Sequence, residues 1–189
     1  KGDLACQTSS WSTKLIHGGI RYLENYEFGL VRKSLKEREV IKFIAPHISR
    51  NIRFVMPHVA NLRPSWIIRI GLFFYDKLGG FVTLPKSKYV NLIKDYIDNP
   101  IKETFKKGYE YSDIQIDDSR LVLLNAQDSI SRGVKVITNT SVISTKRHND
   151  FWEIKLSDKS TIKCKALINA TGPFVLHVLE NICNIKTNK

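Results

Sequence analysis

The stretch "TSSWSTKLIHGGIRYLE", residues 8–24, combines five hydroxyl side chains, a lysine, a histidine, two adjacent glycines and an arginine. Hydroxyl groups and a lysine near a helix start suit a phosphate or pyrophosphate, because they donate to oxygen without bulky groups in the way. Adjacent glycines let the backbone approach a flat ligand closely, since no Cβ intervenes. Arg21 could then form a forked contact with a second anionic group. The pattern favours an anionic ligand with a flat ring, although serine-rich runs and glycine pairs are also typical of solvated loops.

The composition indicates a globular protein with an anionic partner. The chain has 189 residues, of which 42% are hydrophobic and 25% charged, so it can bury one core or two small ones. Its formal net charge of +12 favours a phosphorylated metabolite, a nucleotide, nucleic acid or an acidic membrane surface. The charge alone does not choose among them.

The cysteines and the hydrophobic stretches indicate a cytoplasmic setting. Cys6, Cys164 and Cys183 are odd in number and far apart, which favours neither a disulfide framework nor a zinc site. We find no signal peptide, and the longest apolar stretch, residues 66–78, is too short and too charged to span a bilayer. We therefore expect a reducing, cytosolic compartment.

The first half of the chain predicts two helices and a strand between them. Helical spacing of Phe28, Val31 and Leu35 predicts an amphipathic helix that ends before Pro46. The alternation in "NIRFVMPHV", residues 51–59, predicts a half-buried strand. Ser65 is the expected N-cap of a helix through Leu78, and Gly79 and Gly80 would stop it. We expect loops around a short helix in residues 81–107.

The second half predicts a helix followed by a β-meander. "YEYSDIQI", residues 109–116, has the pattern of a strand, and Asp117 or Asp118 would cap a helix that Gly133 terminates. Period-two patterns in residues 134–140, 151–156 and 161–166 predict three strands. The next residues, "ALINATGP" (166–173), have the pattern of an apolar strand that reaches a ligand crevice in a parallel α/β sheet.

Several long blocks in the same order identify a family resemblance. These blocks are "DLACQTSSWSTKLIHGGIRYLENYEFGLVRKSLKEREV", "APH", "LRPSWIIRIGLFFYDKLG", "KGYEYSDIQIDDSRLVLLNAQ" and "LINATGP". Together they resemble flavin-dependent, quinone-linked glycerol-3-phosphate dehydrogenases over residues 3 to about 175. The resemblance implies an α/β fold in which an incomplete, Rossmann-like FAD-binding domain is interleaved with a mixed-sheet substrate cap. Residues 1–45 and 126–189 would belong to the FAD-binding domain, and residues 46–125 to the cap.

The resemblance also assigns roles to individual residues. Residues implied to contact the FAD pyrophosphate and the ring edge are Thr8, Ser9, Thr13, Lys14 and Leu15. His17, Gly18 and Gly19 would pass beside the isoalloxazine, while Arg21 and Tyr22 would face the substrate phosphate. Val142 would meet the adenine through its backbone, and Ala170, Thr171 and Gly172 would close against the FAD. His17 is also a candidate catalytic base, although flavin packing or a hydrogen bond to the ring would equally require an imidazole there.

The implied reaction is oxidation of sn-glycerol 3-phosphate to dihydroxyacetone phosphate, with hydride passing to FAD and electrons then passing to quinone. An oxidase that uses oxygen is the alternative within the same fold. Segment 66–78 could contact lipid peripherally at the cytoplasmic membrane face, although a core helix beneath the cap is favoured. A basic nucleic-acid-binding fragment is the rival from another class, but the basic residues are dispersed and no recognition motif occurs, so we expect no nucleic acid. The remaining histidines lack ligand spacing, and we expect no metal.

The resemblance implies that two parts of the family pattern that bear on activity are missing, a glycine-rich unit before residue 1 and a second half after residue 189 that carries more of the cap, further basic substrate-binding residues and a returning FAD segment. No G-x-G-x-x-G occurs in the chain, and in the family this loop precedes "DLAC". Without that unit the helix dipole that holds the pyrophosphate is missing. We therefore expect a truncated piece with little or no activity alone.

Overall fold

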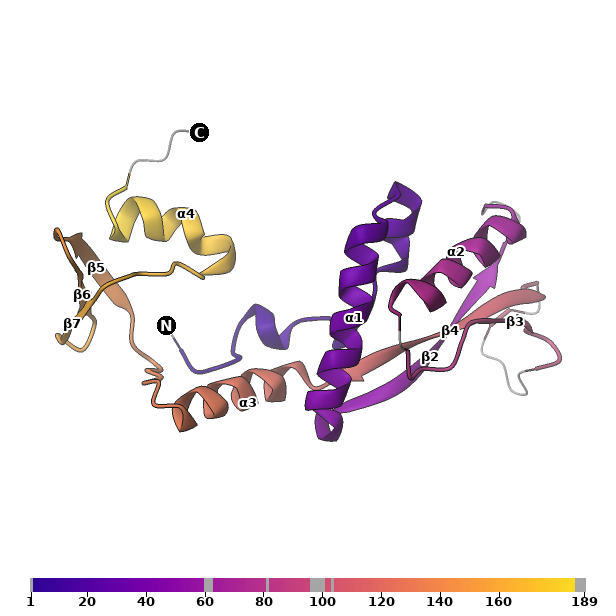
Figure 1. Cartoon of the computed structure of the whole chain (residues 1–189), viewed down its shortest axis with the longest axis horizontal. Helices are drawn as coiled ribbons and strands as arrows, with labels where there is room; N and C mark the ends of the chain where they lie inside the picture. The colour runs from indigo at the N-terminus through magenta and orange to yellow at the C-terminus, as the bar shows by residue number, and fades with distance from the viewer. Residues whose placement is uncertain (1, 60–62, 81, 96–100, 103, 186–189) are drawn as a thin grey trace. The chain divides into compact units, whose positions relative to one another are not determined.

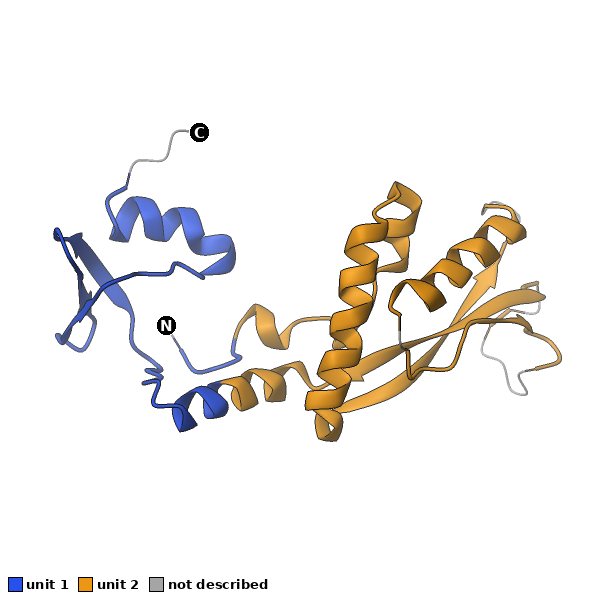
Figure 2. Cartoon of the chain, viewed as in Figure 1, with its two compact units in different colours: residues 1–6, 126–189 blue, residues 7–125 orange. Residues whose placement is uncertain are grey.

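The structure is a computed structural model that describes residues 2–59, 63–80, 82–95, 101–102 and 104–185 (Figure 1). It has two compact units (Figure 2). The larger unit comprises residues 7–125, and the smaller unit comprises residues 1–6 and 126–189.

A four-stranded antiparallel sheet organises the larger unit. Its strands are β1 (Leu15–Ile16), β2 (Ser49–His58), β3 (Lys88–Asn91) and β4 (Lys107–Ile116). β2 pairs with β4 along its whole length, so β1 and β3 share the other edge of β4. The strand expected at residues 109–116 is confirmed. It begins at Lys107, and it is central in the sheet because it is paired along both edges.

The register of β2 against β4 defines the face of the sheet on which the candidate site lies. Ile52, Phe54 and Met56 lie opposite Asp113, Tyr111 and Tyr109. Directly opposed residues share a face. The predicted half-buried strand is confirmed, although its residues from Ile52 to His58 are all half-buried and do not alternate in exposure. The Phe54 and Tyr111 rings stack on this face with centroids 5.3 Å apart.

Two helices pack beside this sheet (Figure 1). α1 (Phe28–Ile44) ends before Pro46 as predicted, and α2 is formed by Ser65–Leu78. Val31 and Leu35 of α1 form a buried cluster with Tyr75 of α2, whose ring meets that of Tyr111 at 6.1 Å. Among the described residues, no helix has the length and apolar character needed to cross a membrane.

Two expectations in this region are wrong. Pro64, not Ser65, occupies the N-cap of α2, and the Ser65 hydroxyl is hydrogen-bonded to that of Tyr109 instead. In place of loops around a short helix, residues 88–91 form β3, and no helix occurs in the described part of residues 82–107. Strand β3 depends on pairing with a segment about 20 residues away, which local pattern does not report. The expected stop after Leu78 is confirmed, with Gly80 at φ 80°.

The third helix shows which of two adjacent aspartates is the cap. α3 (Asp118–Ser131) begins after Asp117, whose Oδ1 accepts a hydrogen bond from the Arg120 N–H at 2.9 Å. This is the geometry of a side-chain N-cap. Gly133, at φ 87°, follows the end of the helix as predicted.

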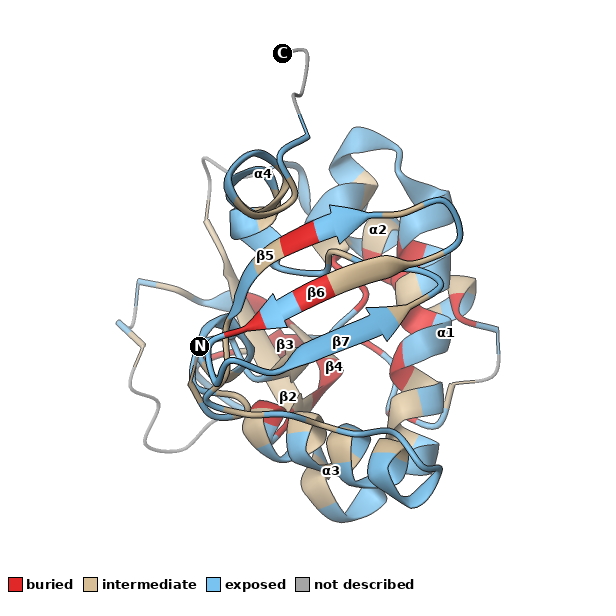
Figure 3. Cartoon of the chain, turned by 90° about the vertical axis from the view of Figure 1, so that its left-hand side faces the viewer, coloured by how far each residue is buried: buried red, intermediate tan, exposed pale blue. Residues whose placement is uncertain are grey.

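The smaller unit contains an antiparallel meander of β5 (Val142–Arg147), β6 (Trp152–Leu156) and β7 (Thr161–Cys164). Its buried residues include Ile154 and Leu156 of β6 (Figure 3). The strands predicted in 151–156 and 161–166 are confirmed. The strand predicted at 134–140 is wrong, because the first strand of the meander begins only at Val142.

The strand expected in "ALINATGP" is also absent from the described structure. Residues 166–171 have no regular structure, and Ile168 is 86% exposed. A strand is held by hydrogen bonds to a neighbour, and no described segment pairs with residues 134–140 or 166–171. The chain continues as short helical turns, namely η4 (Gly172–Phe174), α4 (Val175–His177) and the π-helix η5 (Val178–Ile182).

Candidate functional site

A cavity of about 420 Å³ in the larger unit brings together five of the residues predicted from the sequence. These are Leu15, His17, Gly19, Arg21 and Tyr22. Ile20 of the same segment also lines the cavity, and the sheet contributes Phe54, Tyr111 and Asp113 from one of its faces. The cavity lies within the volume range typical of small-molecule sites.

The glycine pair is held from inside the unit. The Gly18 N–H donates to the Tyr75 hydroxyl at 2.8 Å. A Cβ on Gly18 would lie 2.5 Å from Leu35 and 2.8 Å from the Tyr75 ring. Gly19 has φ 69° and precedes η2 (Ile20–Asn25), the turn that carries Arg21 and Tyr22. The glycines therefore serve the core and the turn as well as any ligand.

The His17 ring is oriented by a hydrogen bond from the backbone of Gly19. The Gly19 N–H donates to His17 Nδ1 at 3.0 Å. An acceptor at Nδ1 places the proton of the neutral imidazole on Nε2. His17 is exposed, so Nε2 is the nitrogen it can offer to a ligand.

Arg21 belongs to a second cavity as well. This cavity, of about 450 Å³, has an apolar floor from η2, β2 and α2, and Arg21, Glu24 and Arg63 among its polar lining. Arg63 and Glu24 lie 3.8 Å apart and both are largely exposed. Arg21 has no recorded ion pair among the described residues, so its charge is available to an anion.

Some side chains of residues 8–14 have no hydrogen-bond partner in the described structure, whereas others are already bonded within the protein. Thr8, Ser9 and Thr13 are exposed and make no side-chain hydrogen bond within the described structure. Lys14 is committed: its Nζ lies 2.6 Å from Asp118 Oδ1 and 3.1 Å from a backbone carbonyl. The free hydroxyls match the donor chemistry of a phosphate-bearing cofactor.

Asp118 anchors this loop to the start of α3. It accepts from the Ser12 hydroxyl at 2.7 Å as well as from Lys14. The hydrogen bonds from Lys14 and Ser12 hold the pKa of Asp118 below its ordinary value. Asp117 and Asp118 thus have separate structural roles, a helix cap and a loop anchor.

Sequence reasoning missed a group of buried polar residues, one of which, Asp113, lines the cavity. Arg38 of α1, Tyr75 of α2 and Asp113 of β4 are each at most 3% exposed. Burial raises the pKa of Asp113, while hydrogen bonds from Tyr75 and Arg38 oppose that rise. The available signal was an aspartate inside the strand pattern of "YSDIQI", where a charge needs a buried partner.

The remaining predicted residues lie in the smaller unit. Val142 is the first residue of β5, and Ala170, Thr171 and Gly172 lead into η4. The Thr171 hydroxyl donates to Asn169 Oδ1 at 2.7 Å, and Gly172 has φ 56°. In the described part of the chain, no group of three or more His, Cys, Asp or Glu side chains is placed to hold a metal.

Comparison with curated proteins links the whole chain to flavoenzymes. The family model for FAD dependent oxidoreductases matches residues 1–187. The aerobic glycerol-3-phosphate dehydrogenase of Escherichia coli K12 is 49% identical over 95% of this chain and 36% of its own length. The D-erythritol 1-phosphate dehydrogenase of Brucella abortus is 46% identical over 96% of this chain and 37% of its own length. The chain thus spans about a third of the length of these relatives.

Two solved structures share the fold. The glycerol-3-phosphate dehydrogenase of Bacillus halodurans, complexed with FAD, aligns with a TM-score of 0.59 at 21% identity, over 95% of this chain and 30% of that one. The L-α-glycerophosphate oxidase of Mycoplasma pneumoniae, also with FAD bound, aligns with a TM-score of 0.67 at 15% identity, over 95% and 48%. These likenesses confirm the expected α/β fold. With the family match running through nearly every residue, the chain belongs to the FAD-dependent oxidoreductase family.

Proposed function

We propose that this chain forms part of an enzyme that oxidises sn-glycerol 3-phosphate to dihydroxyacetone phosphate. The observation that carries the proposal is the single cavity in which Arg21, Tyr22 and His17 meet beside the glycine pair. A cavity of about 420 Å³ suits a three-carbon phosphoester. The 49% identity to the Escherichia coli aerobic glycerol-3-phosphate dehydrogenase supports the same substrate.

In this proposal Arg21 binds the substrate phosphate. A guanidinium offers two parallel donors to phosphate oxygens, and Arg21 has no competing ion pair among the described residues. The Tyr22 hydroxyl, next to it on η2, supplies a neutral donor. His17 donates from Nε2 to the substrate or the flavin. In the neutral tautomer held by Gly19 it cannot accept the hydroxyl proton there, so donation is favoured over the role of catalytic base.

FAD, when bound, supplies the acceptor for the hydride that leaves the substrate carbon. We assign the pyrophosphate and ring edge to Thr8, Ser9, Thr13, Lys14 and Leu15. The three hydroxyls among them are exposed and free, and the Lys14 ammonium, which donates to Asp118 and to a backbone carbonyl, has a third N–H to offer. Gly18 and Gly19 would lie beside the ring. Residues assigned to the adenine end and the far side of the cofactor are Val142, Ala170, Thr171 and Gly172.

Quinone as electron acceptor and peripheral contact with the cytoplasmic membrane face belong to the same proposal. α2 buries Leu72 and Tyr75 and exposes Trp66, Ile70 and Phe73 on its other side. An exposed aromatic side with basic residues nearby suits an interfacial contact. Co-sedimentation with vesicles of mixed neutral and anionic lipid tests this contact. We expect Trp66→Gln to weaken it, and an unchanged bound fraction would contradict it.

The substrate assignment is tested by Arg21→Ala in the FAD-loaded enzyme. Loss of a charged hydrogen-bond donor should raise KM for glycerol 3-phosphate roughly 10- to 100-fold. The control is Arg32→Ala, an exposed arginine on α1 that should leave KM unchanged. A full-length protein containing this segment that shows no flavin absorption band and no turnover with any acceptor would refute the proposed function.

A four-carbon polyol phosphate is the second candidate substrate, supported by the 46% identity to the Brucella D-erythritol 1-phosphate dehydrogenase. Comparing kcat/KM for glycerol 3-phosphate and erythritol phosphates decides between the two. Running both with quinone and with oxygen as acceptor separates a dehydrogenase from an oxidase.

A further inference from the structure

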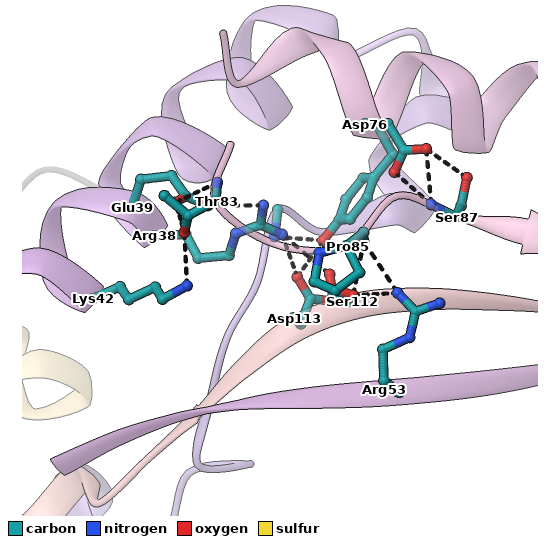
Figure 4. A network of polar contacts seen from close by, with 12 residues as sticks. Arg38, Glu39, Lys42, Arg53, Asp76, Thr83, Pro85, Ser87, Ser112 and Asp113 are labelled. Atoms are coloured by element: carbon teal, nitrogen blue, oxygen red, sulfur yellow. Dashed lines mark hydrogen bonds and ion pairs between the residues drawn. The ribbon is translucent and has the colours of Figure 1, made fainter. Parts of the chain in front are cut away.

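A continuous chain of hydrogen bonds runs from α1 to the glycine pair. Arg38 Nη1 donates to Asp113 Oδ1 at 2.8 Å, and the Tyr75 hydroxyl donates to the same oxygen at 2.8 Å. The Tyr75 oxygen in turn accepts from the Gly18 N–H at 2.8 Å. The Arg38 and Asp113 end of this chain is drawn in Figure 4. Three elements distant in sequence thus converge on one backbone N–H.

The chain is shielded from water. Arg38 and Tyr75 are each 2% exposed and Asp113 is 3% exposed. A buried polar group that loses its partner has no water to replace it, so each link depends on the next. Arg38 is further held by the Ser112 carbonyl at 3.2 Å and by Glu39 at 3.2 Å.

The chain ends at the candidate site. Asp113 itself lines the cavity with His17 and Arg21. Gly18 touches Tyr75 as closely as a glycine can, since a Cβ there would clash with the ring. The next residue, Gly19, donates to His17 Nδ1. The position of the Gly18 backbone therefore helps to place the Gly19 N–H that bonds to His17 Nδ1, and this bond selects the tautomer of His17.

We infer that Arg38, Asp113 and Tyr75 are positioning residues that hold the Gly18–Gly19 backbone and thereby keep the neutral His17 ring protonated at Nε2. The catalytic meaning of this arrangement rests on the proposed function, whereas the hydrogen-bond geometry does not. A purely structural role is the alternative. In that case removing a link would lower stability but leave the Gly18 amide and the His17 tautomer unchanged in the folded protein.

The decisive variant is Tyr75→Phe, which removes one hydroxyl and keeps the ring that packs on Leu35 and Tyr111. In the ¹⁵N-labelled protein, well below its unfolding temperature, we expect the Gly18 amide to exchange with solvent about tenfold faster or more. We also expect the His17 ring nitrogens to change from the shifts of a single tautomer to averaged shifts. The matched control is Tyr89→Phe, whose ring is 48% exposed and whose hydroxyl makes no hydrogen bond to any residue that the structure describes. Wild-type exchange and wild-type ring shifts in Tyr75→Phe would overturn the inference.

Asp113→Asn provides a second, independent test. An asparagine side-chain oxygen can still accept the hydrogen bond from Tyr75. The Gly18 amide should therefore exchange with solvent more slowly in Asp113→Asn than in Tyr75→Phe. A Gly18 amide that exchanges faster in Asp113→Asn than in Tyr75→Phe would contradict the order of the links. Both readouts come from the protein without cofactor or substrate. A full-length protein containing this segment that lacks glycerol 3-phosphate activity would therefore refute the proposed function and leave this inference standing. In an active enzyme, Tyr75→Phe should lower kcat with little change in KM.

Discussion

Gly18 has no side chain because the core of the larger unit occupies the space. Leu35 and Tyr75 fill the position where a Cβ would sit, and the same tyrosine accepts the Gly18 N–H. Gly19 differs, since its φ of 69° lies in the region that favours glycine. Gly18 is thus constrained by packing against the core, whereas Gly19 is constrained by its backbone conformation and by the Tyr22 ring, which would lie 2.5 Å from a Cβ there.

Gly18→Ala should destabilise the protein by about 1 to 3 kcal/mol, because the added methyl group overpacks a well-filled core. Gly29→Ala in α1 is the matched control. A Cβ there meets nothing within 4 Å, and alanine favours the helix by about 0.5 to 1 kcal/mol. Urea unfolding of the three proteins measures both effects. Equal shifts in the same direction would contradict the packing argument.

The hydrogen bonds that Asp118 accepts from Ser12 and Lys14 should make the free energy of unfolding fall at low pH. The pKa of Asp118 is lowered in the folded protein by Lys14 and Ser12. A lowered carboxyl pKa adds stability that is present above the unfolded value of about 3.9 and is lost as the pH falls through the folded value. Asp118→Asn should therefore flatten the decline in stability below about pH 4. Thermal unfolding from pH 6 to pH 2 checks this, and parallel curves for both proteins would contradict it.

At the scale of elements, polar contacts connect the 83–87 segment to its surroundings (Figure 4), in addition to the buried side chain of Leu84. Thr83 bonds to Glu39 of α1 at 2.7 Å, and the Ser87 hydroxyl bonds to Asp76 of α2 at 2.6 Å. Arg53 of β2 donates to the Pro85 carbonyl at 3.0 Å. A loop held from both helices and the sheet can lead directly into β3.

Arg38→Met should destabilise the protein by about 3 to 5 kcal/mol, because it leaves Asp113 buried without its cation. Arg32→Met on the exposed side of α1 should change stability by no more than about 0.5 kcal/mol. Chemical denaturation compares the two. Similar small effects would show that the ion pair does not connect α1 to β4 energetically.

At the scale of the molecule, both units expose large apolar side chains. Phe43 at the end of α1 is 85% exposed, and Ile168 in the smaller unit is 86% exposed. Isolated apolar residues on a surface are ordinary, but side chains this exposed favour association with other apolar surfaces.

Phe43→Ser combined with Ile168→Thr should reduce self-association without changing the free energy of unfolding by more than about 0.5 kcal/mol. Sedimentation velocity over a range of concentrations measures the association. Leu72→Ser, at a fully buried site, is the contrasting variant and should lower stability. An unchanged association state in the double variant would show that other surfaces are responsible.

Local pattern was sufficient for much of this protein. The spacing of Val31 and Leu35 predicted α1, period-two patterns predicted strands β6 and β7, and ordered motif blocks predicted the flavoenzyme family. These features depend on residues close together in the chain, so their signals are complete in the sequence. The cavity residues from Leu15 to Tyr22 share one short segment, whereas Phe54, Tyr111 and Asp113, which complete the cavity, come from distant parts of the chain.

Contacts between distant segments explain what the pattern missed. β3 forms because β4 is available as a partner, while residues 134–140 and 166–171 have strand-like sequences but no described partner. The ion pair of Lys14 with Asp118 likewise joins residues that are far apart in the chain. The same holds for the hydrogen bonds that connect Arg38 to Gly18. A strand needs a neighbouring strand and a buried charge needs an opposite charge. When these two partners are far apart in the chain, the local sequence pattern around one of them does not identify the other.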